Sequence, residues 1–269
     1  MKYGLYLRNM GPQSSRATVL ACARAAEAAG IDDLWVADHI AIPPDDAVGS
    51  GGRYLDPLAT LAYLAGATER IGLGTGVLVL PYRPALATAK WLATIQELSA
   101  GRLRLGVGAG WMPAEFRAVG VPRARRGRIT DETLAFVNAC FANDEVQANG
   151  QPFLFLPRPA RPPIFVGGTP PHALRRAVEY GDGWMPTGGD PAALGPAIAT
   201  LRGLAADAGK PVPEVVLVTS LPLADAPRAA ALIAELAALG VTRVVHGWRY
   251  ADVDEFAATA DVLVRVARP

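Results

Sequence analysis

Short apolar segments alternate with longer amphipathic segments eight times along the 269 residues of the chain. The apolar segments are nearly continuous in valine, isoleucine and leucine, as expected for strands that are covered on both faces. They span residues 2–7, 33–36, 71–79, 103–107, 164–166, 183–185, 215–219 and 243–246. The predicted helices follow them, at about 15–29, 56–67, 84–99, 126–142, 170–180, 191–209, 226–239 and 252–267.

Strands that alternate with helices form βαβ units and a parallel sheet. Eight units match a closed (β/α)8 barrel, the TIM barrel, and the chain is close to the ~250 residues that this α/β fold needs. An open, doubly wound sheet is the structural alternative. Because no internal repeat or low-complexity linker interrupts the pattern, we expect one domain over residues 1–269.

Composition narrows the possible partners. The net charge of +1 gives no field that would attract nucleic acid or an anionic membrane. No apolar run reaches the ~18 residues of a transmembrane helix, and the chain starts directly with a strand pattern, so we expect a cytoplasmic protein. Cys22 and Cys140 lie in alanine-rich helical segments and are predicted to be buried free thiols. No cluster of residues has metal-ligand spacing.

Three long irregular segments interrupt the pattern. Two of them, 37–55 and 108–125, follow predicted strands, and such loops build the active site of a barrel. The third, 143–163, contains a predicted small hairpin around Gly150. We therefore expect the functional site on the side of the first two segments.

Asp38 and His39 directly follow the strand predicted at 33–36. This position places both residues at the catalytic face of a barrel, where histidine can give or take a proton near neutral pH. Asp38 could hydrogen-bond a heterocyclic ligand or orient the loop. The alternative is that Asp38 caps the loop and His39 packs passively.

Glycines are concentrated in the next two predicted strands. In the segment 71–80 they surround Thr75, and a flat ring could lie against Thr75, Gly76 and Val77. Tight packing inside the barrel is the alternative explanation. The following strand leads into Gly108, Ala109, Gly110 and Trp111. Met112 and Pro113 come next instead of a helix, so this is not the dinucleotide-binding fingerprint.

Two further features indicate anion binding. Gly167, Gly168 and Thr169 connect a strand to a helix, and free N–H groups at such a turn can hold a phosphate. A tight turn without a ligand is the alternative. A cluster of basic residues lies at the start of the helix predicted at 126–142, either as a solvated surface or as a site for an anionic group: Arg123, Arg125, Arg126 and Arg128.

Taken together, these motifs resemble the luciferase-like monooxygenase superfamily, and in particular its branch that uses the deazaflavin coenzyme F420. The resemblance covers most of residues 1–190. It is carried by the order and spacing of the segments LWVADH (34–39), the region 55–116 with IGLGTGVLVLP and GRLRLGVGAGW, RRGRITDETLAFV (125–137) and PPIFVGGTPPHALRRAVEYGDGW (162–184).

The resemblance implies a bacterial luciferase-like TIM barrel with the coenzyme ring at its mouth, against 75–77 and 108–111, and the phosphate toward 167–169. It implies a non-proline cis peptide that would fall at Gly76–Val77. Asp38 and His39 match a pair that faces the deazaflavin and the substrate in relatives. Family members are often homodimers, so a homodimer is expected.

One position departs from the sugar-phosphate dehydrogenases of the deazaflavin branch. Those enzymes have a glutamate after the glycines, where this chain has Trp111 and Met112. Glu115 could take over the role of that glutamate. The substitution predicts a substrate pocket that is more apolar than a sugar-phosphate site.

We therefore hypothesise an oxidoreductase that transfers hydride between F420 and a small organic substrate, with His39 handling the proton. The same barrel with FMN, acting as a monooxygenase, is the nearest alternative. A non-catalytic coenzyme-binding barrel is a second alternative, which the Asp38–His39 pair disfavours. A barrel hydrolase or aldolase lacks paired carboxylates, metal ligands and a candidate Schiff-base lysine.

Overall fold

The eight apolar segments form parallel strands in the order β1-β10-β9-β8-β7-β4-β3-β2, and β2 also pairs with β1, so the sheet closes into a barrel. The computed structural model describes residues 1–268. The barrel strands are β1 (Lys2–Tyr6), β2 (Asp33–Val36), β3 (Gly72–Val79), β4 (Leu103–Gly108), β7 (Ile164–Gly167), β8 (Gly183–Met185), β9 (Glu214–Thr219) and β10 (Arg243–His246). This closure confirms the predicted (β/α)8 barrel and rules out the open sheet.

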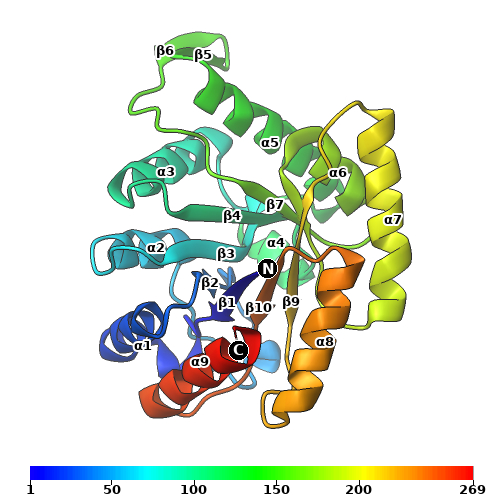
Figure 1. The fold of residues 1–269 in the computed structure, drawn as a ribbon. Helices are drawn as coiled ribbons and strands as arrows, with labels where there is room; N and C mark the ends of the chain where they lie inside the picture. The colour runs from blue at the N-terminus through cyan, green and yellow to red at the C-terminus, as the bar shows by residue number, and fades with distance from the viewer. Residues whose placement is uncertain (269) are drawn as a thin grey trace.

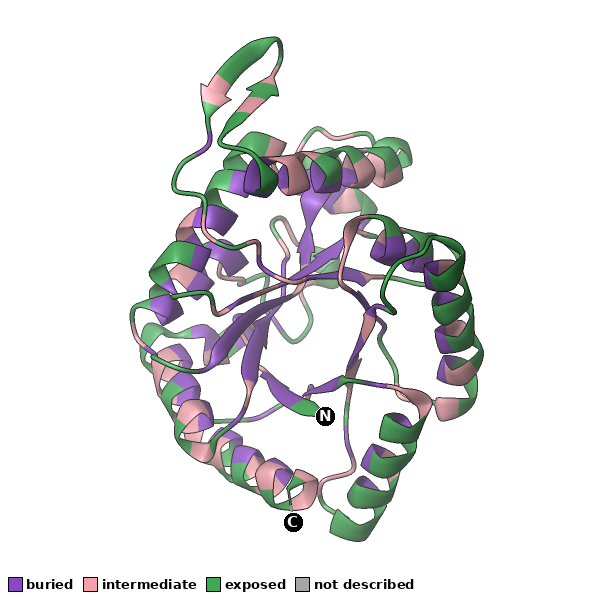
Figure 2. Ribbon diagram, turned by 45° about the horizontal axis from the view of Figure 1, so that its top comes forward, coloured by how far each residue is buried: buried purple, intermediate pink, exposed green. Residues whose placement is uncertain are grey.

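Helices surround the barrel and turn their buried faces toward the strands (Figures 1 and 2). They are α1 (Arg16–Ala29), α2 (Pro57–Ala65), α3 (Ala85–Leu98), α4 (Pro113–Ala118), α5 (Arg126–Ala142), α6 (His172–Tyr180), α7 (Pro191–Asp207), α8 (Ala226–Leu239) and α9 (Val253–Ala267). Side chains such as Asp56, Asp225 and Asp252 accept hydrogen bonds from the first turns of α2, α8 and α9, which fixes where these helices begin. The short helix α4 was not predicted.

Two side chains of β2 show how the barrel interior is filled. Asp33 pairs with Arg243, and its Oδ1 lies 3.6 Å from Nε of Arg104, near the amino ends of the strands. One layer above, the ring of Trp35 lies 6.0 Å from that of Phe165. The interior of the barrel is therefore a packed core and not a channel.

The glycines of β3 are partly explained by this packing. A Cβ atom on Gly72 would meet the Asp33 carboxylate, and one on Gly74 would meet the Trp35 ring. These two glycines make room for neighbouring side chains of the protein. Gly76, one layer higher, reaches the mouth of the barrel, where a ligand can be accommodated.

The segment between α5 and β7 contains an antiparallel hairpin, β5 (Glu145–Ala148) and β6 (Gln151–Leu154). Asn149 and Gly150 form its turn with φ angles of 49° and 77°, a conformation typical of a tight two-residue hairpin. The hairpin projects away from the barrel and is largely exposed (Figures 1 and 2). The predicted hairpin is confirmed, and its position keeps it apart from the strand ends that build the site.

Cys22 and Cys140 are buried free thiols, as predicted, and burial raises the pKa of both to about 11. Within residues 1–268, no helix combines the length and the apolar character needed to cross a membrane. Across the same residues, no group of three histidine, cysteine, aspartate or glutamate side chains is arranged to hold a metal ion.

Candidate active site

A cavity of about 670 Å³ opens at the carboxyl ends of the barrel strands. This volume is typical of sites for small molecules and coenzymes, which span ~300–1,000 Å³. Four groups of predicted site residues line it: Asp38 and His39, Gly76 and Val77, residues 108–111, and residues 167–169. The structure thus brings together segments that are up to 131 residues apart, because parallel strands end at the same rim of the barrel.

His39 lies in the loop after β2, with its imidazole close to two aromatic side chains. The ring centroids are 4.9 Å from Tyr54 and 6.2 Å from Trp111. Nδ1 of His39 lies 3.1 Å from Oε2 of Glu115, while about 20% of the side chain is exposed. His39 is therefore held on one side and open to the cavity on the other.

Glu115, on α4, is 1% exposed and accepts four hydrogen bonds. The N–H groups of Ile40 and Ala41 donate to Oε1, at 2.6 and 3.1 Å. The hydroxyl of Tyr82 donates to Oε2 at 2.9 Å, beside His39. Burial by itself raises the pKa of Glu115, but these hydrogen bonds outweigh it and hold the pKa below its usual range.

A carboxylate only accepts hydrogen bonds, so the Nδ1 atom of His39 carries the hydrogen in this contact. In the neutral imidazole the other nitrogen, Nε2, is then left as a proton acceptor. Glu115 therefore fixes the tautomer and the orientation of His39. The sequence motifs indicate Glu115 only as a substitute for a missing glutamate. In the fold it lies behind His39 and does not line the cavity.

Asp38 lines the cavity, but its oxygens are engaged within the protein. Arg83 donates to both of them, at 2.6 and 2.9 Å, and the N–H of Val79 donates to Oδ2 at 2.8 Å. Arg83 also binds Asp56 at 2.7 Å. Burial alone lowers the pKa of Arg83, but its two carboxylate partners raise it above the ordinary value. This arrangement fits a residue that fixes the loop after β2.

The Gly76–Val77 peptide bond is cis, at the position that the resemblance implied. The Tyr6 hydroxyl donates to the carbonyl oxygen of Gly76. The Val77 side chain lies against two glycines: a Cβ atom on Gly108 or Gly167 would be 2.6 or 2.8 Å from its methyl carbons. Glycine at both positions lets β3, β4 and β7 close together around the cavity floor.

Thr75, predicted to contact the coenzyme, does not line the cavity. Its side chain is fully buried, and its hydroxyl donates to the carbonyl oxygen of Gly106 at 2.7 Å. Thr75 precedes Gly76 in an extended strand, so its side chain points to the opposite face. It supports the wall of the cavity from behind.

The opposite end of the cavity is basic. Beside the turn 167–169 it is lined by Arg126, His172 and Arg176. Gly168 has a φ of 117°, which side-chain-bearing residues rarely adopt, and His172 begins α6. Arg176 is bonded to Asp131 and to the carbonyl oxygen of Gly127, which ties the starts of α5 and α6 together.

The arginines at the start of α5 do not share one role: some lie on a solvated surface and one faces the cavity, where an anionic group could bind. Arg126 lines the cavity, whereas Arg128 pairs with Glu132 at 2.7 Å on the exposed side of α5. Arg123 donates to the carbonyl oxygen of Trp111 at 3.1 Å and so fixes the loop after β4. Sequence spacing alone did not separate these roles, because Arg126 and Arg128 differ only in which side of the helix they occupy.

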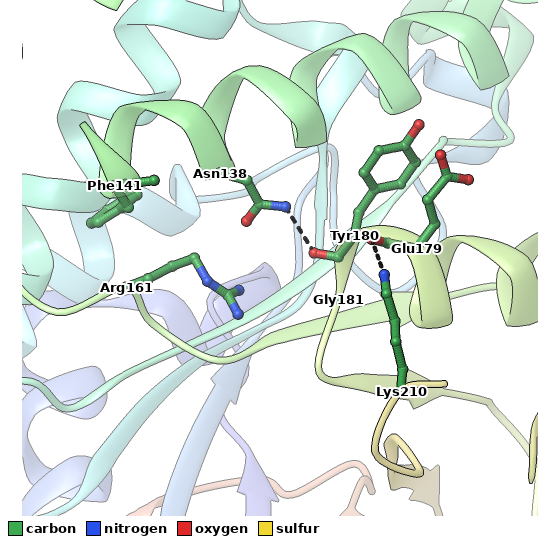
Figure 3. Close-up of a pocket in the computed structure, with 8 residues that line it drawn as sticks. Asn138, Phe141, Arg161, Glu179, Tyr180, Gly181 and Lys210 are labelled. Carbon is green, nitrogen blue, oxygen red and sulfur yellow. Dashed lines mark hydrogen bonds between the residues drawn. The ribbon is translucent and has the colours of Figure 1, made fainter. Parts of the chain in front are cut away.

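A second depression, of about 390 Å³, lies between α5, α6 and the segment before β9 (Figure 3). Its cationic groups already have partners: Lys210 donates to the carbonyl oxygens of Val178 and Glu179, and Arg161 binds Asp182. It lies at the amino ends of the strands, away from His39. The cavity at the carboxyl ends is therefore the stronger candidate site.

The fold and the site define a TIM barrel with a coenzyme-sized cavity at its mouth. The profile of the luciferase-like monooxygenase family matches residues 2–264, so the chain belongs to that family. An uncharacterised protein of Mycobacterium tuberculosis is 35% identical over 217 residues, 74% of this chain and 75% of that protein. The F420-dependent hydroxymycolic acid dehydrogenase of the same species is 32% identical over 182 residues, 62% of this chain and 48% of that protein.

Two solved structures share the fold over almost the whole chain. An F420-dependent secondary alcohol dehydrogenase in complex with an F420-acetone adduct has a TM-score of 0.82 and 19% identity, covering 98% of this chain and 97% of that one. A monooxygenase from Streptomyces bottropensis has a TM-score of 0.81 and 20% identity, covering 98% of both chains. At these identities the likeness is one of architecture.

Proposed function

We propose that the protein is an oxidoreductase that uses coenzyme F420 for hydride transfer to or from a small organic substrate at the mouth of the barrel. One observation carries the proposal: His39, whose tautomer Glu115 fixes, faces a cavity large enough for a coenzyme and a substrate. The sequence relationship to an F420-dependent dehydrogenase supports the choice of coenzyme.

The residues of the cavity suit a flat ring with an anionic tail. Gly76, Gly108, Ala109 and Gly110 offer a wall with little side-chain bulk for the ring. The turn 167–169, with Arg126 and Arg176, offers N–H groups and positive charge for a phosphate. When bound, a deazaflavin supplies two-electron hydride chemistry and does not readily activate oxygen.

His39 handles the proton that accompanies the hydride. With Nδ1 donating to Glu115, Nε2 accepts a proton from an alcohol oxygen, or returns one to a carbonyl oxygen after it has been protonated. Asp38, held by Arg83 and Val79, keeps the loop that carries His39 in place. The rings of Tyr54 and Trp111 lie beside His39 at this end of the cavity.

FMN with monooxygenase activity is the second candidate. The basic end of the cavity is suitable for the phosphate of FMN as well, and the architectural similarity to a monooxygenase supports this alternative. The buried support of His39 disfavours the third reading, a non-catalytic coenzyme-binding barrel, because a passive carrier needs no fixed tautomer.

Titration of the purified protein with F420 and, separately, with FMN tests the proposal through the fluorescence of each coenzyme. We expect saturable F420 binding at least about tenfold tighter than FMN binding, about 1.4 kcal/mol. The reverse preference, with substrate-dependent oxygen consumption, would support the monooxygenase. Binding of neither coenzyme would contradict both proposals.

A further inference from the structure

We propose that the substrate is an uncharged, mainly apolar carbonyl compound or the corresponding secondary alcohol, and that the indole of Trp111 forms its binding surface beside His39. This inference rests on the proposed function, which it extends from the type of reaction to the class of substrate. It follows from three features of the cavity: an exposed indole on a fixed backbone, aromatic neighbours around His39, and a one-sided distribution of charge.

Trp111 presents a large apolar side chain that the protein itself does not cover. Its exposed fraction is 65%, although its backbone is held firmly. The preceding residue, Gly110, has a φ of 76°, and a Cβ atom there would lie 2.7 Å from Cγ1 of Val79. Arg123 binds the carbonyl oxygen of Trp111, and Met112 is buried. An apolar side chain that is exposed on a fixed backbone at a cavity is suited to contact a ligand.

The indole lies next to the residue that handles the proton. Trp111 and His39 meet edge to face at 84°, and the ring of Tyr54 lies 4.9 Å from the imidazole. Ile40, which follows His39 in the chain, is 47% exposed. A substrate oxygen that reaches His39 therefore brings the rest of the substrate against aromatic and aliphatic groups.

Charge is distributed unevenly along the cavity. The basic lining residues Arg126, His172 and Arg176 gather at the end formed by α5 and α6. Near His39, the carboxylates of Asp38 and Glu115 are already bonded to protein donors. A charged substrate group at this end would lose water away from Arg126 and Arg176, the arginines that line the cavity among residues 1–268.

The reaction is balanced with the coenzyme of the proposed function as the two-electron partner. In reduction, the C=O π bond breaks, the carbon gains a hydride from a reduced deazaflavin, and the oxygen gains a proton from His39. The product is a secondary alcohol, and the deazaflavin is oxidised. In the reverse direction, Nε2 of His39 would take the hydroxyl proton, and the hydride of the same C–H bond would pass to the oxidised deazaflavin as the C=O π bond forms.

A matched pair of ketones tests the substrate class by binding. Octan-2-one and 7-oxooctanoate share the methyl ketone and differ at the far end, where a carboxylate replaces a methyl group. Saturation-transfer NMR follows both ligands, competing for the protein alone and for the protein saturated with F420 or with FMN. We expect octan-2-one to bind at least about tenfold more tightly than 7-oxooctanoate.

Two tryptophan variants locate the effect. Trp111→Ala is expected to weaken octan-2-one binding about tenfold or more, and Trp111→Phe to restore most of it. Trp91→Ala is the matched control, because Trp91 is 46% exposed on α3 and does not line the cavity. The inference would be overturned if the two ketones bound equally or if 7-oxooctanoate bound more tightly. It would also be overturned if octan-2-one bound in none of the states, or if Trp111→Ala left its binding unchanged. Because binding is also measured without coenzyme, failure of the F420 titration alone would overturn only the proposed function.

Discussion

Nδ1 of His39 and Oε2 of Glu115 lie 3.1 Å apart, although the two residues are 76 positions apart in the chain. The contact joins the loop after β2 to the short helix α4, and it decides which nitrogen of His39 faces the cavity. Tyr82 and the N–H groups of Ile40 and Ala41 hold the carboxylate from its other sides.

Glu115→Gln is expected to reverse the tautomer of His39. The amide oxygen of glutamine still accepts the hydrogen bonds from the N–H groups of Ile40 and Ala41, so the amide NH₂ points at Nδ1 of His39. Because that NH₂ donates, Nδ1 must accept, and the hydrogen of His39 moves to Nε2. Turnover is expected to fall by about 10²–10⁴-fold while F420 affinity is retained. The ¹⁵N chemical shifts of His39 report the tautomer directly. Glu132→Gln, which affects only an exposed pair with Arg128, is the control; an unchanged tautomer would refute the positioning role of Glu115.

Arg126→Ala is expected to weaken F420 binding about tenfold, because it removes a charge-assisted partner for the anionic part of the coenzyme. Turnover at saturating F420 is expected to change little, since Arg126 makes no hydrogen bond to His39 or to Glu115. Arg128→Ala serves as the control on the exposed side of the same helix. Equal F420 affinities of the two variants across a salt series would rule out Arg126 as a coenzyme contact.

Asp38→Asn is expected to lower the free energy of unfolding by about 3 kcal/mol, because Arg83 loses a buried, doubly bonded carboxylate. Asp56→Asn is the matched control. Asp56 binds the same arginine from an exposed position, and asparagine preserves its capping of α2, so a loss below about 1 kcal/mol is expected. Urea unfolding measures both values, and similar losses in the two variants would argue against the structural role of Asp38.

His246 is expected to make stability depend on pH. The side chain is 4% exposed, its Nδ1 accepts a hydrogen bond from the N–H of Leu221 at 2.9 Å, and burial lowers its pKa from 6.5 to about 4. The unfolded chain therefore binds this proton at a higher pH than the folded chain. The contribution is fully present above about pH 6.5 and is lost as the pH falls toward 4, by about 3 kcal/mol. His246→Gln should flatten this part of the stability curve in urea titrations; parallel curves would speak against it.

The sequence predicted the barrel well because its information is local. Each strand is a short segment rich in apolar residues, and the predicted helix bounds lie within two residues of those found. The helix α4 was missed because its six residues, following Met112 and Pro113, are too few to establish a period. Without this helix, the sequence indicates Glu115 as a candidate residue but not its contact with His39.

The remaining features of the site depend on long-range register. Nothing local in the sequence links Asp38 to Arg83, 45 residues later. The outward position of Thr75 could have been anticipated, since alternation along a strand places it opposite to Gly76. The homodimer and the cytoplasmic location stay predictions, which size-exclusion chromatography with light scattering and cell fractionation test.

The most direct test of the account is the comparison of His39→Ala with the unmodified protein in F420 binding and in F420-dependent turnover of a panel of ketones and secondary alcohols. We expect His39→Ala to bind F420 within about twofold of the unmodified protein and to turn over about 10²-fold more slowly, or slower still. Unchanged turnover by His39→Ala would contradict the central claim that His39 moves the proton.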